Sequence, residues 1–261
     1  MFRFMVVLIF LITVLGLSCE NVFAKEVDLE EGVEVFSDVE KIEADITDVP
    51  ITIVESNVEE ITVTSTVENT GIGIVTQPKV WKKGNVLRFH QGYMIGYCTE
   101  STGDVRIEIP EGMNLDIEIT SGSGDVTVDT SVSDNILIDA TVGEKTITSK
   151  GENLAIKSVS GNININGGFS DTKIETINSD VQMHADADTA QIYYESVSGD
   201  ANICAAGVKG CNLKYKYAGG KIDKYYEMEE DSQKTFDVTG ETVDGRINIV
   251  NCDESCKGLR Q

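Results

Sequence analysis

Leu154-Ala155-Ile156-Lys157-Ser158-Val159-Ser160-Gly161-Asn162-Ile163-Asn164-Ile165 contains the pattern that decides the fold. Apolar and polar residues alternate on both sides of Gly161. A period of two is typical of a β-strand that buries one face, and glycine suits a tight turn. The stretch therefore predicts a strand, a turn and a second strand, with Leu154, Ile156, Ile163 and Ile165 pointing inward.

The same pattern recurs along the chain around a series of turn residues. These markers are Gly103, Gly124, Gly143, Gly161, Ser179, Gly199, Gly220 and Gly245, at steps of 18 to 25 residues. Apolar residues stand two and four places after the markers: Val105 and Ile107, Val126 and Val128, Ile163 and Ile165, Val181 and Met183, Ala201 and Ile203, Ile247 and Ile249. Others stand seven and five places before them: Ile117 and Ile119, Ile136 and Ile138, Leu154 and Ile156, Leu213 and Tyr215, with Thr172 and Ile174, and Ile192 and Tyr194, fitting less cleanly.

A repeat of this length predicts an all-β fold, a single β-solenoid with about 18–21 residues per rung. An antiparallel β-sandwich is the alternative, since regular short strands also occur there. Only a solenoid requires the same inward residues at the same distance from every turn, because those residues stack on one another. Lys145, Lys224 and Gly240 fall on inward positions, and we expect a bulge or a register shift at each.

The chain divides into four parts by these criteria. Residues 1–24 form a secretory signal, residues 25–100 an irregular N-terminal β cap with the first rungs, residues 101–250 the solenoid repeats, and residues 251–261 a polar C-terminal cap or tail. In the second part, residues 39–46, 49–53, 61–67 and 86–89 are expected to form strands. Residues 91–102 form the longest irregular stretch with aromatic residues, and residues 225–233 form an acidic insertion.

The N-terminus predicts export. An apolar run from Phe4 to Leu17 follows Arg3, too short for a membrane-spanning helix but suited to the apolar core of a signal peptide. We expect cleavage after Ala24, which makes Lys25 the first mature residue. Two alternatives stay open: lipidation of Cys19, since residues 15–19 resemble a lipobox that has Gly16 where leucine is usual, and an uncleaved anchor.

The cysteines suit an oxidising compartment. After cleavage five remain, so at least one lacks a partner within a monomer. Cys204 and Cys211 flank a short turn, and Cys252 and Cys256 are separated by three residues, so both spacings suit local disulfides. We expect a Cys252–Cys256 bridge to form a charged cap over residues 247–250, taken as the last strand of the stack. A zinc site is the alternative, but the sequence has no CxxC spacing and no histidine near these cysteines.

Charge excludes several functions. The chain has 261 residues, 44 acidic against 21 basic, and a formal net charge of −23. Binding to nucleic acid or to anionic membranes needs an excess of lysine and arginine, so neither is expected. The two histidines, His90 and His184, leave few choices for histidine-based catalysis, and we expect His90 to have a packing role.

Acidic residues follow many of the turn markers. They are Asp104, Asp125, Glu144, Asp180 and Asp200, and stacking would place them in a ladder. One interpretation is a calcium site, because Ca²⁺ takes several carboxylate oxygens. The favoured interpretation is turn chemistry, since aspartate after glycine bonds the local backbone. Likewise, residues 184–188 (His-Ala-Asp-Ala-Asp) are expected to form a solvated turn rather than a metal site.

Several of these motifs together resemble the bacterial putative adhesin family, whose Toastrack-like domains are β-solenoids. They are the paired strands of residues 42–53, residues 105–112 (VRIEIPEG), residues 119–126 (ITSGSGDV), residues 158–163 (SVSGNI) and residues 196–200 (SVSGD). The resemblance covers approximately residues 35–250, and the cysteines are a departure from the usual pattern. It implies an exported or envelope protein with no established catalytic residues.

No nucleophile elbow, zinc-protease motif or phosphate loop occurs in the sequence, and no catalytic, cofactor or metal residue is expected. We therefore expect an exported, non-catalytic β-solenoid with a structural or binding role at the cell envelope. Its partner would be a surface protein or a glycan. The alternatives are an accessory module that reports stress through a membrane partner and, less favoured, a polysaccharide-cleaving enzyme on a β-helix.

Overall fold

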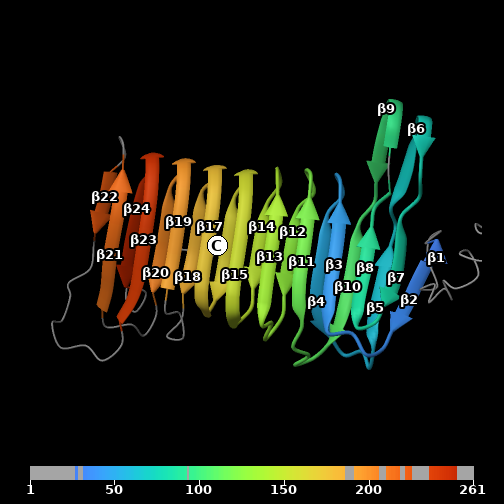
Figure 1. Cartoon of the computed structure of the whole chain (residues 1–261), viewed down its shortest axis with the longest axis horizontal. Helices are drawn as coiled ribbons and strands as arrows, with labels where there is room; N and C mark the ends of the chain where they lie inside the picture. Colours follow the sequence, from blue (N-terminus) through green and yellow to red (C-terminus); the bar gives the residue numbers. More distant parts are fainter. Residues whose placement is uncertain are drawn as a thin grey trace, which may run out of the picture.

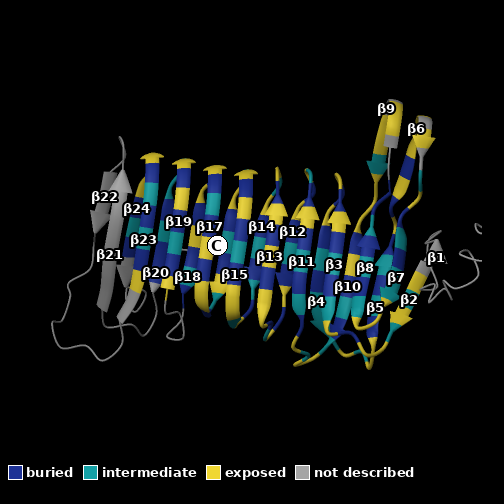
Figure 2. Cartoon of the chain, viewed as in Figure 1, coloured by how far each residue is buried: buried dark blue, intermediate teal, exposed yellow. Residues whose placement is uncertain are grey.

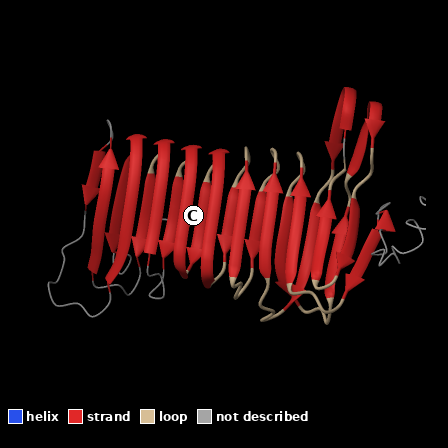
Figure 3. Ribbon diagram, in the orientation of Figure 1, coloured by secondary structure: helices blue, strands red, loops and turns tan. Residues whose placement is uncertain are grey.

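The computed structural model describes residues 27–28, 32–92, 94–185, 191–205, 210–217, 221–224 and 235–251. All regular secondary structure in these ranges is β (Figure 3). The strands form two eleven-stranded sheets, which run the length of an elongated stack, and one two-stranded sheet at its side (Figure 1). The all-β prediction is confirmed.

Each long sheet has eleven strands, whose order in space differs from their order in the sequence. Sheet A contains β1 (Val27–Asp28), β7 (Lys79–Lys83), β8 (Val86–His90), β3 (Lys41–Ile46), β11 (Asp116–Ser121), β13 (Asn135–Ala140), β15 (Gly151–Ser160), β17 (Phe169–Asn178), β19 (Gln191–Ser198), β23 (Thr235–Asp244) and β21 (Gly210–Tyr217). Sheet B contains β2 (Gly32–Phe36), β5 (Ile61–Ser65), β10 (Val105–Pro110), β4 (Ile51–Ser56), β12 (Val126–Asp129), β14 (Lys145–Thr148), β16 (Ile163–Gly167), β18 (Val181–Ala185), β20 (Ala201–Ala205), β24 (Arg246–Asn251) and β22 (Lys221–Lys224).

Neighbouring rungs pair in parallel and in the register that the turn markers predict. Ile136 of β13 pairs with Leu154 of β15, and Ile163 of β16 pairs with Val181 of β18. From β10 onward, each circuit of the chain thus adds one strand to each sheet, as in a β-solenoid. Nearer the N-terminus, the pairs β1–β7, β7–β8, β2–β5 and β5–β10 are antiparallel. Parallel pairing of successive units contradicts the antiparallel sandwich.

The inward columns form one continuous core between the two sheets (Figure 2). The residues two and four places after the described markers are buried, with the aliphatic ones at 3% exposure or less. From Gly124 onward, so are the described residues seven and five places before the markers, including Thr172 and Tyr194. The side chains of Leu213 and Tyr215 lie outside the described residues.

The last rung in the sequence is not the last rung in space. β24 lies between β20 and β22, and β23 lies between β19 and β21. The prediction that residues 247–250 end the stack is therefore wrong, because β22 covers that edge of β24. Parallel rungs join through backbone hydrogen bonds, which any sequence can make, so a later rung with matching inward residues can enter between two earlier ones.

A similar exchange occurs near the other end. β3 and β4 come early in the sequence, yet β3 lies between β8 and β11, and β4 between β10 and β12. The expected strands at residues 39–46, 49–53, 61–67 and 86–89 are present as β3, β4, β5 and β8. The first of them are embedded within the stack instead of capping it.

The residues that misfit the repeat cause no bulge. Lys145 pairs in continuous register with Val126 on one side and Ile163 on the other. Gly240 pairs with Tyr194 in unbroken register, and a side chain there would meet Cδ1 of Ile247 at 2.3 Å. Lys224 also pairs in register, with Ile249. The expected bulges are wrong, since each misfit is accommodated by its neighbours' side chains or by the backbone ladder.

One pair of corners is extended into an arm. Elsewhere short turns join the sheets, but β6 (Glu68–Val75) lies between β5 and β7, and β9 (Met94–Thr102) lies between β8 and β10. The two pair antiparallel and project beyond the other strands (Figure 1). We call residues 68–77 and 91–102 the arm. It contains the whole stretch that the sequence marks as irregular, residues 91–102, most of which forms the regular strand β9.

The described residues include no helix capable of crossing a bilayer.

Candidate functional site

The outer face of sheet A carries an open pocket of about 310 Å³ where β7, β8, β3 and β11 lie side by side. Alternation along these strands directs Trp81, Arg88, Glu43 and Glu118 outward, while Val80, Leu87, Ala44 and Ile117 face the core. The register then aligns the outward residues in one row: Trp81 opposite Arg88, Arg88 opposite Glu43, and Glu43 opposite Glu118. A second row contains His90, Asp45 and Thr120.

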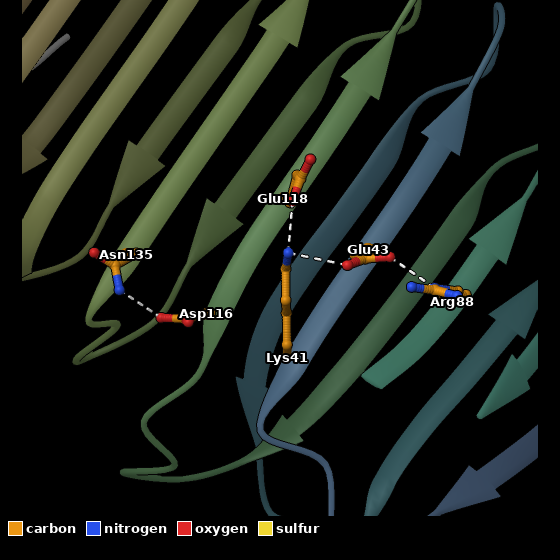
Figure 4. A network of polar contacts seen from close by, with 6 residues as sticks. All are labelled: Lys41, Glu43, Arg88, Asp116, Glu118 and Asn135. Carbon is orange, nitrogen blue, oxygen red and sulfur yellow. Dashed lines mark hydrogen bonds and ion pairs between the residues drawn. The ribbon is translucent and has the colours of Figure 1, made fainter. Parts of the chain in front are cut away.

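Ion pairs connect the row across three strands (Figure 4). Arg88 Nε lies 2.7 Å from Oε2 of Glu43. Lys41 Nζ lies 2.9 Å from the other oxygen of Glu43 and 2.6 Å from Oε2 of Glu118. Each partner is about a third exposed. The network therefore fixes side-chain positions more than it stabilises the fold.

These contacts set the protonation of the pocket. Hydrogen bonds from Arg88 and then Lys41 hold the pKa of Glu43 below its usual value. Hydrogen bonds to Glu118 and then Glu43 raise the pKa of Lys41. Both groups are accordingly charged at neutral pH. A proton donor for hydrolysis would need the opposite, a carboxyl group with a raised pKa.

His90 lies in the pocket rather than in the core, which corrects the expected packing role. Its Nδ1 accepts the N–H of Gly92 at 2.7 Å, and its Nε2 lies 3.4 Å from Oδ2 of Asp45. In the neutral ring the proton therefore sits on Nε2 and is directed toward Asp45. The side chain keeps a fifth of its surface exposed, so Nε2 faces the pocket.

The acidic ladder at the turns has a structural role. Oδ1 of Asp125 accepts the N–H of Glu144 at 2.7 Å, and Oδ1 of Asp180 accepts the N–H of Asp200 at 2.9 Å. Oδ1 of Asp200 in turn accepts the N–H of Arg246 at 2.9 Å. Asp104 differs, since its Oδ1 accepts from the hydroxyl of Thr66. Each of these carboxylates thus bonds the adjacent rung or strand and not the local backbone of its own turn, a structural role that differs from both the turn interpretation and calcium binding.

Among the described residues, no three histidine, cysteine or acidic side chains come close enough to hold a metal ion. His184 lies in β18, while Asp186 and Asp188 lie outside the described residues. The structure therefore assembles no metal site from the described part of the 184–188 motif.

Of the candidate disulfide residues, Cys204 is disulfide-bonded and lies in β20. Cys211 lies in β21, but its side chain is outside the described residues. Cys19, Cys252 and Cys256 are also outside them. The pairing and the lipidation alternative stay predictions.

Another group with a shifted pKa, the amine of Lys145, lies in the core. Lys145 is fully buried and donates to Oγ of Ser158 at 2.7 Å and to the carbonyl of Ser160 at 2.8 Å. Burial lowers the pKa of its amine to about 8, partly offset by Asp125. A lysine with a lowered pKa is often reactive. Here no surface is exposed to a ligand, so the amine belongs to the packing of the solenoid.

The residues of the pocket are not among the candidates that the sequence suggests. Trp81 is the only tryptophan in the chain, and an outward aromatic among alternating residues is a recognisable signal. The neighbours of Trp81 could not be found in that way, because β8 pairs with β3 across a long stretch of sequence.

Several known proteins are similar to the chain. Solved structures similar to the chain include a putative adhesin from Bacteroides fragilis, at 14% identity over 86% of this chain and 100% of that one, with a TM-score of 0.48. Another is a putative adhesin from Parabacteroides distasonis, at 15% identity over 87% and 98%, with a TM-score of 0.44. A third is a putative cell adhesion protein from Clostridium sporogenes, at 14% identity over 87% and 99%, with a TM-score of 0.31.

No curated protein matches the chain. A family model does: residues 138–253 match the one described as Toastrack DUF4097. That range begins in β13 and extends past β24, so it covers the rungs in which the turn motif is most regular. Residues 138–253, less than half of the chain, are therefore similar to the Toastrack family.

Proposed function

We propose that the chain is an exported, non-catalytic β-solenoid that binds a saccharide of the cell envelope or of a neighbouring cell through the Trp81 pocket. The observation that carries this proposal is the charge balance of the pocket. Its row of residues contains Glu43 and Glu118, but Lys41 pairs with both of them and Arg88 pairs with Glu43.

This balance favours binding over hydrolysis. Cleavage of a glycosidic bond needs one carboxyl group that keeps its proton and a second carboxylate placed across from it. The pKa of Glu43 is lowered, so its carboxyl group is a poor proton donor at neutral pH. The carboxylate of Glu118 accepts a hydrogen bond from Lys41 at 2.6 Å, which leaves it as a fixed acceptor.

The pocket offers the chemistry that a neutral sugar ring requires. An indole face that is partly exposed can cover the apolar face of a pyranose. The carboxylates of Glu118 and Asp45 are acceptors for sugar hydroxyls, and the guanidinium of Arg88 is a donor. A charged ligand is a poorer fit, because cations and anions alternate along the ion-pair network of Arg88, Glu43, Lys41 and Glu118.

Three observations support export to the envelope. The apolar run of residues 4–17 is typical of a signal peptide. In addition, Cys204 is disulfide-bonded, and disulfides persist mainly in oxidising compartments. A net charge of −23 fits a protein that stays soluble outside the cell.

A glycan array tests the proposal. The chain and its Trp81→Ala variant are compared with Tyr193→Ala, which removes another aromatic side chain from the outer face of sheet A. Tyr193 lies far from the pocket, on β19, where its hydroxyl donates to Glu195 at 2.8 Å. We expect the Trp81 variant to lose binding by about tenfold or more and the Tyr193 variant to keep it.

Mass spectrometry of the incubated glycans provides the second readout. Intact glycans are expected after prolonged incubation with the chain. Cleaved products, or array binding that is equal in both variants, would overturn the assignment of a binding function to this pocket.

A further inference from the structure

One exposed apolar residue recurs near the end of each of four neighbouring strands of sheet A. Each stands two places before a turn marker, in a motif that reads serine or threonine, then valine or isoleucine, then a polar residue and the marker. These residues are Val159, Ile177, Val197 and Val243. They keep 42–50% of their surface exposed, whereas the serine or threonine before each of them is buried. We call the four residues the ridge.

The register of sheet A places the ridge residues beside one another. The residues on either side of each ridge residue pair from β15 to β17, from β17 to β19 and from β19 to β23. Figure 2 shows the ends of these strands exposed, in a row along one edge of the stack. At about 4.8 Å per strand the row extends about 14 Å. The ridge is therefore one continuous apolar line that crosses the strands.

The turns do not require an apolar residue at this position. Ala140 pairs with Ser158, so Thr141 stands in the next rung where Val159 stands in β15. Thr141 is exposed and β-branched, and threonine suits a strand as valine does. Valine or isoleucine in four successive rungs therefore serves something other than the turn. A contiguous apolar surface with a polar border is typical of a binding site for another molecule.

Carboxylates border the ridge on both sides. Three lie on the outer face of sheet A, two places before a ridge residue: Glu175, Glu195 and Glu241. Three more follow a ridge residue by one or three places: Asp180, Asp200 and Asp244. Cations stand toward the two ends of the row, where Lys157 and Lys173 lie 3.9 and 2.5 Å from Glu175 and where Arg246 begins β24. The complement of this surface is an apolar line with basic residues on both sides.

The spacing of the ridge favours a helix over an extended peptide. A helix advances about 5.4 Å per turn, so apolar residues on one face of four turns follow four rungs with a total mismatch of about 2 Å. An extended peptide presents side chains to one face about every 6.7 Å, which gives a mismatch of about 6 Å, more than one rung. In addition, β15, β17, β19 and β23 each pair on both sides, so an added strand finds no edge there.

We propose that the ridge binds a basic amphipathic helix of another protein, with the apolar face of the helix on the ridge and its lysines or arginines against the carboxylates on either side. The net charge of −23 attracts such a partner and repels a second copy of this chain. The site is separate from the saccharide pocket, which lies on β7, β8, β3 and β11, and it does not rest on the proposed function.

The test is fluorescence anisotropy of labelled synthetic peptides titrated with the purified chain. The first peptide consists of leucine and lysine over about five helical turns, with leucine every three or four residues so that one face is apolar. In the second peptide leucine and lysine alternate, which is the period of a strand. The third has the helical pattern with glutamate in place of lysine.

Two variants of the chain locate the binding. The ridge variant carries threonine at all four ridge positions: Val159→Thr, Ile177→Thr, Val197→Thr and Val243→Thr. Thr141 shows that such a position accepts threonine. The control variant carries the same kind of change at four exposed positions elsewhere, with 53–70% exposure: Val33→Thr, Val35→Thr, Ile72→Thr and Ile74→Thr. Circular dichroism checks that both variants remain folded.

We expect the helical lysine peptide to bind in a saturable way and the ridge variant to bind it about tenfold more weakly, while the control matches the unmodified chain. Added salt should weaken binding, because it screens the attraction between lysines and carboxylates, and the glutamate peptide should not bind.

Three results would each overturn the proposal. The first is equal binding by the ridge variant and the unmodified chain, which would show attraction by net charge alone. The second is binding of the alternating peptide as tightly as the helical one. The third is no binding of the helical lysine peptide, whether or not the ridge then proves to attach the chain to phosphatidylcholine vesicles or to a second copy.

Discussion

The amine of Lys145 lies 2.7 Å from the hydroxyl of Ser158 inside the solenoid, where the columns above and below Lys145 hold Val126 and Ile163. The hydrogen bond joins β14 of sheet B to the corner of β15 in sheet A. Ser158 remains satisfied without the amine, because its hydroxyl also donates to the carbonyl of Ser160. A buried charge costs more to desolvate than two hydrogen bonds return.

Lys145→Met is therefore expected to raise the free energy of unfolding at pH 7. The folded pKa of about 8 lies below the unfolded value of 10.5, so the unfolded state binds the proton more strongly. The wild type is accordingly destabilised below pH 8 and recovers up to about 3 kcal/mol as the pH rises to 10.5. Urea unfolding should show that the difference in unfolding free energy between the variant and the wild type becomes smaller over that range.

Lys41→Met is the control for this experiment. The pKa of Lys41 is raised, so its contribution is constant below 10.5 and is lost only at higher pH. Its effect on unfolding should not change between pH 7 and 10. If the difference in unfolding free energy between Lys145→Met and the wild type also stays constant over this range, the conclusion that the amine of Lys145 is buried and weakly basic is contradicted.

Ile163→Asp is expected to unfold the stack. Ile163 is fully buried, and its replacement removes an apolar contact and buries a carboxylate, at a cost of about 4 kcal/mol or more. Asn166→Asp on the same strand places its charge at an exposed position and should change the melting temperature little. Asn164 is a poorer control, since its amide donates to Glu144 at 2.6 Å. Similar melting of both variants would refute the inward register.

Gly161→Ala tests how closely the rungs approach at the turns. Gly161 has a φ of +99°, and a side chain there would meet the carbonyl oxygen of Gly143 at 2.0 Å. Gly112 has a φ of +71° but open space around it, so Gly112→Ala isolates the backbone strain. We expect about 1 kcal/mol of destabilisation at Gly112 and about 3 kcal/mol at Gly161 in thermal unfolding. Equal values would mean that the turns can separate at little cost.

Peptide mapping of the oxidised protein tests the arrangement of the cysteines. Cys98 lies on β9 near one end of the stack, whereas Cys204 lies on β20, six strands from β10 in sheet B. At about 4.8 Å per strand the gap is approximately 29 Å, far beyond a disulfide. Cys98 is therefore not expected to bridge to Cys204 within a monomer. The Cys252–Cys256 bridge stays a prediction, which a Cys252 linked elsewhere would contradict.

The core could be predicted from the sequence because its signal is local. Ile163 and Ile165 stand at fixed distances from Gly161, and the same distances recur in each rung, so burial follows from the spacing alone. The order of the rungs could not be predicted in that way. β24 lies between β20 and β22 and pairs with both through backbone hydrogen bonds. Such bonds do not depend on the side chains, so the side-chain pattern does not predict them.

The pocket escaped prediction for the same reason. Arg88 and Glu43 meet because β8 pairs with β3, although 45 positions separate the two residues. No residue pattern in β8 or β3 indicates that these two strands pair. The sequence predicts a break in the repeat at Lys145, since a lysine on an inward position normally indicates an error of register. Its amine instead reaches polar groups at the corner of the rung.

Fluorescence of Trp81 tests the central claim, saccharide binding at the pocket, most directly. Trp81 is the only tryptophan, so its emission reports on the pocket alone. Titration with the glycan that binds best on the array is expected to shift the emission in a saturable way and to protect Trp81 from quenching by acrylamide. Saturable binding by calorimetry with no change in emission or quenching would contradict the account, because the saccharide would then bind elsewhere.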